Sequence, residues 1–447
     1  SDWFMAPAPP RTGTGLNGIA LPDVCFNQTD KRVFHAFVIG DWGGILYKGS
    51  TVPVPADKRS PNFPAFTRTF INGVDDNAQQ RVAAQMKVRA PISQPDYILN
   101  MGDNFYWGGV MAHCGTPTWT HIETGQWQHV FEQVYEGPGL DNKQWLGVLG
   151  NHDYGGYRFT ATWDQVIAYT WGGPRSSGRW VTPAQYWSAK VHYPDFSIDY
   201  YFVDSNVFNA FPPEHMAGHN ICGAAHNVAG ASCGLSGPPS VEECPSWFAN
   251  LWDAEVEWLE RLLSRSSATW QIVVTHFPPI SGKDVWMRIV KRYGVDLILT
   301  GHQHLQAIWG PDEASNFLAP TAVVVSGGGG GITCEGSPDK DGNDDQYGFM
   351  DLTLTREVIT IEAISHGGKL RKTAQVHPRH PAAPAGAEQQ DRDPMDGDRQ
   401  DRERHDRDPK DGRNDTGASK ELGLRGSGRG GGGPRDDPAA AEARHLV

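Results

Sequence analysis

The amino-acid sequence predicts an α/β fold in which two sheets are flanked by helices. Between about residues 32 and 363, apolar strand-like runs alternate with segments of helical spacing, which is typical of a layered fold with parallel strand pairing. The last β-branched and aromatic segments follow one another with little helix between them, which indicates a second, more antiparallel sheet. A chain of 447 residues is long enough for one large domain or two ordinary ones.

The predicted strands fall into two groups along the chain. Five apolar runs that end in polar residues occupy 33–44, 96–107, 145–154, 270–279 and 295–304. The β-branched or aromatic segments are 186–192, 196–203, 321–326, 349–355 and 358–364. Apolar side chains at helical spacing predict helices at 77–89, 126–136, 253–265 and 285–293. For the third helix, Asp253 is the predicted N-cap.

Composition divides the chain into three parts. Residues 1–32 are rich in Pro and Gly and predict an irregular lead-in, and 33–377 form the predicted folded domain. Residues 378–447 consist mainly of Asp, Arg, Gly, Pro and Ala, and cannot bury enough apolar surface to offset their chain entropy. We therefore expect a disordered, solvated tail. The alternative is a tether to a protein or matrix partner.

Charge and hydropathy exclude two classes of partner. The formal net charge is −13, which argues against nucleic acid because phosphate binding needs concentrated Lys and Arg. No apolar run is long enough to span a bilayer, so no transmembrane span is expected. The sequence opens at Ser1 without a signal peptide, and we interpret it as a processed or trimmed chain.

The cysteines indicate an oxidising compartment. None of the six falls in a CxxC pair, which disfavours a zinc–thiolate site. Cys222, Cys233 and Cys244 lie close together in a stretch rich in Gly, Pro and Ser, as in small loops stapled by disulfides. Residues 27–29 and 414–416 are glycosylation sequons. We expect a glycosylated protein that is secreted, extracellular or in an endomembrane lumen; buried thiols in a cytosolic protein are the alternative.

Each of the five polar-ended runs finishes in potential metal ligands. Buried strands are apolar, so the side chains at their exits are where a fold places its chemistry. Oxygen and imidazole ligands without thiolate suit iron, zinc or manganese better than a structural zinc. The candidate ligands are Asp41, Asp103, Tyr106, Asn151, His276, His302 and His304.

The ligand types suggest how two ions would share this set. The carboxylate of Asp103 can bridge two ions, and Tyr106 could reach one of them as a phenolate. His302 and His304 lie two positions apart on an extended segment, so both point to the same face. Each motif alone is typical of an ordinary turn or core residue. Five together predict two ions roughly 3.5–4 Å apart, the arrangement that phosphate-ester chemistry uses.

These motifs carry a family resemblance. GDWGG (40–44), GDNFY (102–106), GNHD (150–153), VTHF (274–277) and GHQH (301–304) resemble the purple acid phosphatases of the calcineurin-like metallophosphoesterases. The spacing is most similar to the tartrate-resistant, mammalian-type enzymes. The resemblance implies a four-layer α/β/β/α sandwich of two mixed sheets flanked by helices. Tyr106 is the specific element, because most metallophosphoesterases lack a tyrosine there.

The resemblance also implies the roles of the site residues. Around a ferric ion it implies Asp41, Asp103, Tyr106 and His304. Around a second ion, Fe(II), Zn(II) or Mn(II), it implies Asp103 as a bridge with Asn151, His276 and His302. His152 would be catalytic, holding the phosphate and protonating the leaving group while a metal-bound hydroxide attacks phosphorus. The implied function is a binuclear acid phosphatase acting on small phosphomonoesters or phosphoproteins.

One departure from the family keeps a second function open. The mammalian-type enzymes carry a further leaving-group histidine shortly after the position matched by His276. Val285 stands near that place here, with Lys283 or Asp284 as a possible substitute. A non-catalytic or weakly catalytic surface or matrix scaffold on the same fold is therefore the alternative. A divalent-metal phosphodiesterase or nucleotidase is the third hypothesis, and Tyr106 argues against it.

Overall fold

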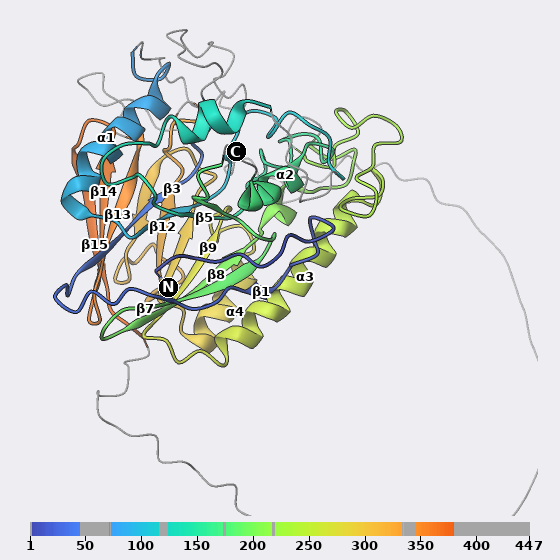
Figure 1. Ribbon diagram of the computed structural model, residues 1–447. Helices are drawn as coiled ribbons and strands as arrows, with labels where there is room; N and C mark the ends of the chain where they lie inside the picture. Colours follow the sequence, from blue (N-terminus) through green and yellow to red (C-terminus); the bar gives the residue numbers. More distant parts are fainter. Residues whose placement is uncertain are drawn as a thin grey trace, which may run out of the picture. The chain divides into compact units, whose positions relative to one another are not determined.

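The computed structural model describes residues 2–44, 71, 73–115, 124–172, 176–216, 220–332, 334 and 346–379. All of these residues fall within one compact unit, Ser1–Ala382. They form two mixed sheets stacked face to face, with helices on both outer sides (Figure 1). The four-layer α/β/β/α sandwich is therefore confirmed. Residues 380–447 of the predicted tail lie outside the described residues.

The first sheet carries three of the five ligand-bearing strand exits. Its order is β15-β14-β13-β3-β4-β5-β6. The parallel half consists of β3 (Phe34–Ile39), β4 (Tyr97–Asn100), β5 (Trp145–Gly147) and β6 (Trp180–Val181). The antiparallel half consists of β13 (Gly348–Leu354), β14 (Ile359–Ser365) and β15 (Leu370–Val376).

The second sheet carries the other two exits. Its order is β1-β7-β8-β9-β10-β12-β11, and β2 also pairs with β7. The central parallel strands are β8 (Ser197–Val203), β9 (Trp270–Thr275), β10 (Leu297–Thr300) and β12 (Ala322–Ser326). The outer strands are β1 (Ile19–Ala20), β2 (Val24–Cys25), β7 (Trp187–His192) and β11 (Gln306–Trp309).

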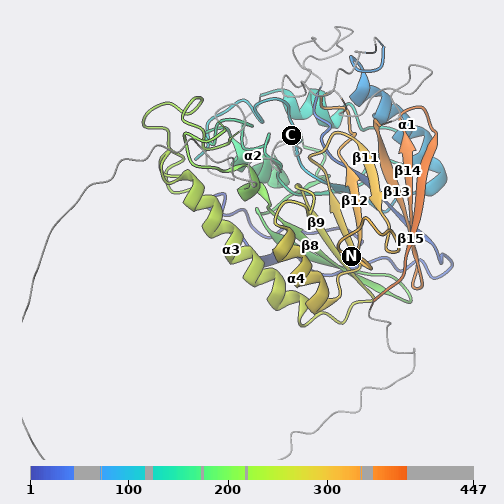
Figure 2. The ribbon, with the colours of Figure 1, turned by 180° about the vertical axis from the view of Figure 1, so that it is seen from behind.

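Helices cover the outer face of each sheet. Helix α1 (Ala78–Ser93) packs on the first sheet, and α3 (Cys244–Leu263) and α4 (Lys283–Tyr293) pack on the second (Figures 1 and 2). The shorter helices are η2 (Trp127–Glu132, a π-helix), α2 (Trp163–Ala168), η3 (Tyr169–Trp171) and η4 (Asn206–Asn209). Of the described helices, none combines the length and apolar composition that crossing a bilayer needs.

Successive side chains of a central strand point to opposite faces of the sheet, and both faces are covered, so these strands are apolar on both sides. In β3, Phe34, Ala36 and Val38 point into the core between the sheets, while Phe37 and Ile39 point towards α1. The strands of the second sheet alternate in the same way between the inter-sheet core and the layer under α3 and α4. Because the central strands are buried on both sides, most of their side chains are apolar, and the candidate ligands follow where five of these strands end.

Every predicted strand overlaps an observed one, but the grouping of the later strands is corrected. We expected them to form a separate, more antiparallel sheet; instead β7, β8 and β12 join the second sheet, and β13 and β14 extend the first. Antiparallel pairing thus lies on both sides of a parallel centre in the second sheet, and on one side of the parallel strands in the first. Local sequence determines that a segment is extended, whereas its partners depend on the path of the chain. The sequence did not reveal β6, β11 or β15.

The start of α3 is also corrected. The helix begins at Cys244, so Asp253 lies within it and is not its N-cap. Pro245 occupies the first turn, where its fixed φ and missing N–H suit a helix start. Cys244 is bonded to Cys222, and Cys114 to Cys233, so the predicted stapling of this region by disulfides is confirmed.

The lead-in 1–32 has little regular structure, but it belongs to the fold. Its two short strands pair in parallel with β7. Phe4, Leu21 and Phe26 are buried in the core between the sheets. Asn27 of the first sequon is exposed, whereas the second sequon lies outside the described residues.

A buried acid lies between α3 and the end of β8. Glu255 is fully buried, and its Oε2 accepts the backbone N–H of Asp204 at 2.9 Å. Its Oε1 has no hydrogen-bond partner among the described residues. Burial, and then the charge of Asp204, raise the pKa of Glu255 well above its usual value. Glu255 therefore remains protonated in the fold at pH values where the unfolded chain has released the proton.

This difference makes the free energy of unfolding depend on pH. Because the folded pKa is the higher one, stability is lost as pH rises from the unfolded pKa through the folded pKa. In the wild type this loss of unfolding free energy amounts to up to about 1.4 kcal/mol for each pH unit between the two pKa values. Glu255→Gln has no proton to release at this position, so we expect the loss to disappear. Urea unfolding of both proteins from acid to neutral pH measures it. Glu257→Gln, on the exposed side of the same helix, is the control. Parallel stability curves for wild type and Glu255→Gln would contradict the assignment.

Candidate metal centre

The predicted ligands converge because the parallel strands of both sheets end at the same side of the sandwich. Strands β3, β4 and β5 lead into Asp41, Asp103 and Asn151, while β9 leads into His276. Strand β10 leads into the segment that carries His302 and His304. Six of the seven candidate ligands are buried, and His302 is half-buried. The structure thus brings together side chains that lie more than half the domain apart in sequence.

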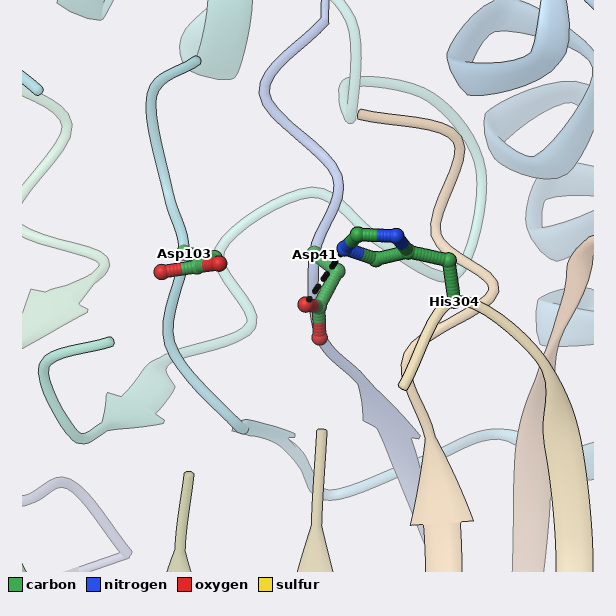
Figure 3. Close-up of side chains that lie close together, drawn as sticks. All are labelled: Asp41, Asp103 and His304. Atoms are coloured by element: carbon green, nitrogen blue, oxygen red, sulfur yellow. Dashed lines mark ion pairs between the residues drawn. The ribbon is translucent and has the colours of Figure 1, made fainter. Parts of the chain in front are cut away.

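One group of ligands surrounds the hydroxyl of Tyr106. This oxygen lies 3.1 Å from Asp41 Oδ1, 2.9 Å from Asp103 Oδ2 and 3.3 Å from His304 Nε2. His304 Nε2 is also 3.5 Å from Asp41 Oδ1. Figure 3 shows Asp41, Asp103 and His304 on three different loops, with the His304 ring next to the Asp41 carboxylate. Ligand atoms of Asp41, Asp103 and His304 all lie within 4.8 Å of one another. This spacing allows one cation to be held between them.

A second group adjoins the first through Asp103. Asn151 Oδ1 lies 3.1 Å from His276 Nε2 and 3.2 Å from His302 Nδ1. His276 Nε2 is in turn 3.4 Å from Asp103 Oδ2, the oxygen that also contacts Tyr106. Asp103 therefore stands between the two groups.

The orientation of His276 fits a cation site. Its Nδ1 lies 2.7 Å from the Met101 carbonyl oxygen, which can only accept, so Nδ1 carries a hydrogen. Nε2 then turns its lone pair towards the oxygens of Asn151 and Asp103, and a positive charge has to lie among these three acceptors. A proton can supply it: burial lowers the pKa of His276, but the charges of Asp103 and Asp41 raise it to about 9. A metal ion meets the same need with all three acceptors as ligands.

The oxygen ligands also disfavour one another's charge. Burial, and then the carboxylates of Asp103 and Asp41, raise the pKa of Tyr106 well above its usual value. Burial likewise raises the pKa of Asp41, with a further contribution from Asp103. For Asp103 burial acts in the same direction, but His276 and His152 outweigh it and hold the pKa well below its usual range. Two carboxyl groups and a phenol that are buried this close together fit a cation site, because a cation between them would stabilise their charged forms.

Left-handed backbone conformations and closely packed glycines position the candidate ligands. Asp41, Asp103 and His302 have φ values of 58°, 54° and 65°, in the left-handed region that residues other than glycine rarely adopt. Side chains also press against glycines: a Cβ on Gly301 would lie 2.4 Å from Asp41 Oδ2, and one on Gly331 2.1 Å from the Tyr106 ring. The glycines of GHQH and of the Gly-rich segment after β12 thus leave room for ligands.

Asp153 holds the two central loops together, a role that the sequence analysis missed. Its Oδ2 accepts the backbone N–H groups of Gly150 at 2.8 Å and Asp103 at 3.0 Å, and the Asn104 side-chain amide at 2.9 Å. Its Oδ1 accepts the backbone N–H of Asn104 at 3.0 Å. The loop after β4 is thereby fixed to the loop after β5. The acidic residue that ends GNHD was the available signal.

His152 lies beside the ligands without joining them. Its ring centroid is 4.4 Å from that of Tyr106, and its Nδ1 is 2.5 Å from the Trp107 carbonyl oxygen. Nδ1 therefore carries a hydrogen, which leaves Nε2 as the reactive nitrogen. Burial lowers the pKa of His152, and the charge of Asp103 partly opposes this. Its backbone N–H also donates to Asp103 Oδ1 at 2.8 Å.

The residues near the expected second histidine belong to a different layer. Val285 lies in the first turn of α4 and packs into the cluster between the helices and the second sheet. The ammonium group of Lys283 lies 4.9 Å from the Phe317 ring centroid, in the same cluster. Asp284 is exposed.

Comparison with known proteins assigns the fold to a family. A family model described as calcineurin-like phosphoesterase matches residues 34–306. The chain belongs to the calcineurin-like phosphoesterase family. The matched segment runs from the start of β3 into β11 and contains all seven candidate ligands and His152.

The curated relatives of this phosphoesterase include acid phosphatases. Tartrate-resistant acid phosphatase type 5 of Homo sapiens is 25% identical over 328 residues, which are 68% of this chain and 79% of the human protein. The Oryctolagus cuniculus protein of the same name is 25% identical over 313 residues, 63% of this chain and 73% of that protein. Purple acid phosphatase 17 of Arabidopsis thaliana is 28% identical over 255 residues, 55% of this chain and 63% of that protein. The predicted resemblance to this group is therefore confirmed at low identity.

A solved structure supports the fold independently. The protein described as GAP50, the anchor in the inner membrane complex of Plasmodium, superposes with a TM-score of 0.52 at 16% identity. The superposition covers 78% of this chain and 90% of that one. At this identity the similarity concerns the fold alone.

The contacts of Asp153 lead to a prediction about stability. Asp153→Asn keeps the shape but turns an NH₂ group towards backbone N–H donors, so at least one buried donor loses its acceptor. We expect the free energy of unfolding to fall by about 2–3 kcal/mol. Denaturant titration measures it, with the exposed Asp141→Asn, which also accepts a backbone N–H, as control. An equal loss of unfolding free energy in the two variants would show that the Asp153 contacts contribute no more to stability than the exposed contact of Asp141.

Proposed function

We propose that this protein is a binuclear metal-dependent acid phosphatase that hydrolyses phosphomonoesters. The observation that carries the proposal is the convergence of seven oxygen and imidazole donors from both sheets into two adjoining groups that share Asp103. A structural zinc would need one closed set of four ligands, whereas two open groups around a shared carboxylate suit two catalytic ions. The low-identity acid phosphatase relatives support the same reaction.

The two groups divide the ligands between two ions. We assign a ferric ion to Asp41, Asp103, Tyr106 and His304. We assign a second ion, Fe(II), Zn(II) or Mn(II), to Asp103, Asn151, His276 and His302. When bound, such a pair would polarise phosphoryl oxygens and lower the pKa of a bound water to about neutral or below. The chain's own contribution is to hold the ligands with Asp153 and to exclude bulk water by burial.

His152 is the proposed catalytic residue. Its ring stands against Tyr106, outside both ligand groups, and the Trp107 carbonyl fixes its Nδ1 hydrogen. Its other nitrogen, Nε2, is free to bind the phosphate and to pass a proton to the leaving alkoxide. The proposed substrates are small phosphomonoesters or phosphoproteins. We further propose secretion or residence in an endomembrane lumen, which the two disulfides support.

A scaffold on the same fold is the second candidate. It is supported by the structural similarity to an anchor protein and by Val285 in place of a leaving-group histidine. The converging donors oppose it, because a pure scaffold has no physical need for buried, mutually repelling acids. The tail 378–447 could tether either kind of protein to a partner.

The two candidates differ in metal content and turnover. Purified protein is analysed for iron, zinc and manganese, scanned in the visible range, and assayed with p-nitrophenyl phosphate from about pH 4 to 8, a range that brackets histidine and carboxylate titration. The proposal expects two metal ions per chain and phosphate release. A metal-free, colourless protein without turnover at any of these pH values would establish the scaffold instead.

Tyr106→Phe tests the ligand assignment. A phenolate bound to ferric iron absorbs visible light, and phenylalanine cannot bind it, so we expect the visible band to vanish. Some phosphatase activity should persist, because the variant lacks a ligand and not the attacking water. Tyr135→Phe, a buried tyrosine away from the ligands, is the matched control. An unchanged spectrum in Tyr106→Phe would refute the assignment.

His152→Ala separates catalysis from metal binding. Because His152 lies outside both ligand groups, we expect the variant to keep its metals while kcat falls at least about 100-fold. Metal analysis and steady-state kinetics on the same preparation measure both. Loss of metal from His152→Ala would mean that this residue is a ligand.

A further inference from the structure

A cavity of about 750 Å³ opens beside the proposed metal centre. Tyr106 and Gly43 line it and also belong to the loops that carry the ligands. Its remaining walls come from the rest of the loop after β4, from the start of η2 and from residues 158–161. The volume lies within the range of small-molecule sites. The cavity is therefore large enough for the organic part of a phosphate ester whose phosphate reaches the ligands.

The wall of this cavity is unusual in its charge. Among the described residues that line it there is no Asp or Glu, although the chain as a whole has a net charge of −13. Arg158 lines it with an exposed side chain, and no described carboxylate forms an ion pair with that guanidinium. An exposed arginine in a cavity whose described wall carries no acid favours an anionic ligand.

Two histidines also belong to the described wall. His113 and His129 also line the cavity. His113 Nδ1 lies 2.7 Å from the Cys114 carbonyl oxygen and His129 Nδ1 lies 3.1 Å from Gln133 Oε1, so each ring gives that hydrogen to an oxygen. Arg158 is the permanently charged residue of the described wall, so the experiments substitute Arg158.

Part of the described wall is apolar, and one of its residues contacts the proposed catalytic residue. Trp107, Val110 and Val130 line it. The Trp107 carbonyl oxygen accepts from His152 Nδ1, so the same residue contributes to the cavity and orients His152. An aromatic or otherwise apolar alcohol seated on this wall would leave from the side where His152 can protonate it.

The cavity wall is fixed on two sides. Gln126 accepts the backbone N–H of Met111 at 2.8 Å through Oε1 and donates Nε2 to the Gly109 carbonyl oxygen at 3.0 Å. At the end of the same loop, Cys114 is bonded to Cys233. A wall held in this way binds a ligand without first having to become ordered, which favours selection between substrates.

We propose that this cavity binds the alcohol part of the substrate and selects phosphomonoesters of aromatic alcohols that carry a second anionic group, which Arg158 binds. The inference rests on the proposed phosphatase function for its catalytic part. The binding part stands on the cavity alone: its apolar side chains, Arg158 and a described wall that carries no acid.

The kinetic test uses two esters that differ by one carboxylate. Phenyl phosphate and 4-carboxyphenyl phosphate are compared with the metal-loaded full chain. We expect kcat/KM to be about tenfold higher for the carboxylated ester, which is the value of one charge-assisted pair. In Arg158→Gln this preference should fall to near one. Arg261→Gln removes an exposed arginine on α3, away from the cavity, and should keep the tenfold preference.

A binding test separates this inference from the proposed function. Calorimetry measures the dissociation constants of 4-hydroxybenzoate and phenol, the two alcohol products, and needs no turnover. We expect about tenfold tighter binding of 4-hydroxybenzoate, lost in Arg158→Gln and kept in Arg261→Gln. This result without turnover of either ester would overturn the phosphatase proposal and keep the anion site. Turnover with no preference and no Arg158-dependent binding would overturn the anion site and keep the phosphatase.

Discussion

The Asp103 carboxylate is the contact on which both halves of the candidate centre depend. Its Oδ2 lies 2.9 Å from the Tyr106 hydroxyl on one side and 3.4 Å from His276 on the other, and its Oδ1 accepts the His152 backbone N–H. A fully buried carboxylate is costly unless positive charge or donors surround it. The fold supplies donors through the Tyr106 hydroxyl and the His152 backbone N–H, and His276 lies on the remaining side. On the proposed function, a proton and a metal ion would compete for that side, which would couple metal binding to the charge state of His276.

Two sheets, rather than one, are needed to build such a site. Three loops with candidate ligands leave the first sheet and two leave the second, so the proposed ion positions lie where the two sheets meet at the ends of their parallel strands. Left-handed backbone at Asp41, Asp103 and His302 is the local cost of turning each side chain inwards. The inter-sheet core offsets that cost, because it fixes both sheets through side chains buried along their whole length.

The convergence of the candidate ligands follows from the sequence more directly than the strand order and the helix boundaries around them. All seven ligand candidates converge because each follows an apolar run closely, and a buried strand leaves few places for polar side chains. The role of Asp153 was missed because it depends on a contact between loops far apart in sequence. The partition of later strands and the start of α3 depend on tertiary pairing and on the Cys222–Cys244 bond, which local periodicity does not encode. Arg158 was missed for the same reason: its cavity exists only once four segments are assembled.

The ligands and the cavity wall are supported by different parts of the chain, and this separates metal binding from substrate choice. Strand ends hold the ligands, whereas Gln126 and the Cys114–Cys233 bond hold the wall, so the wall can change without moving an ion site. Val285 packs under α4, in another layer, and offers no proton to a leaving group. On the proposed function, His152 alone is then left to protonate the leaving alkoxide. Alcohols that are better leaving groups depend least on this protonation. Aromatic alcohols are such leaving groups, which agrees with the apolar wall beside His152.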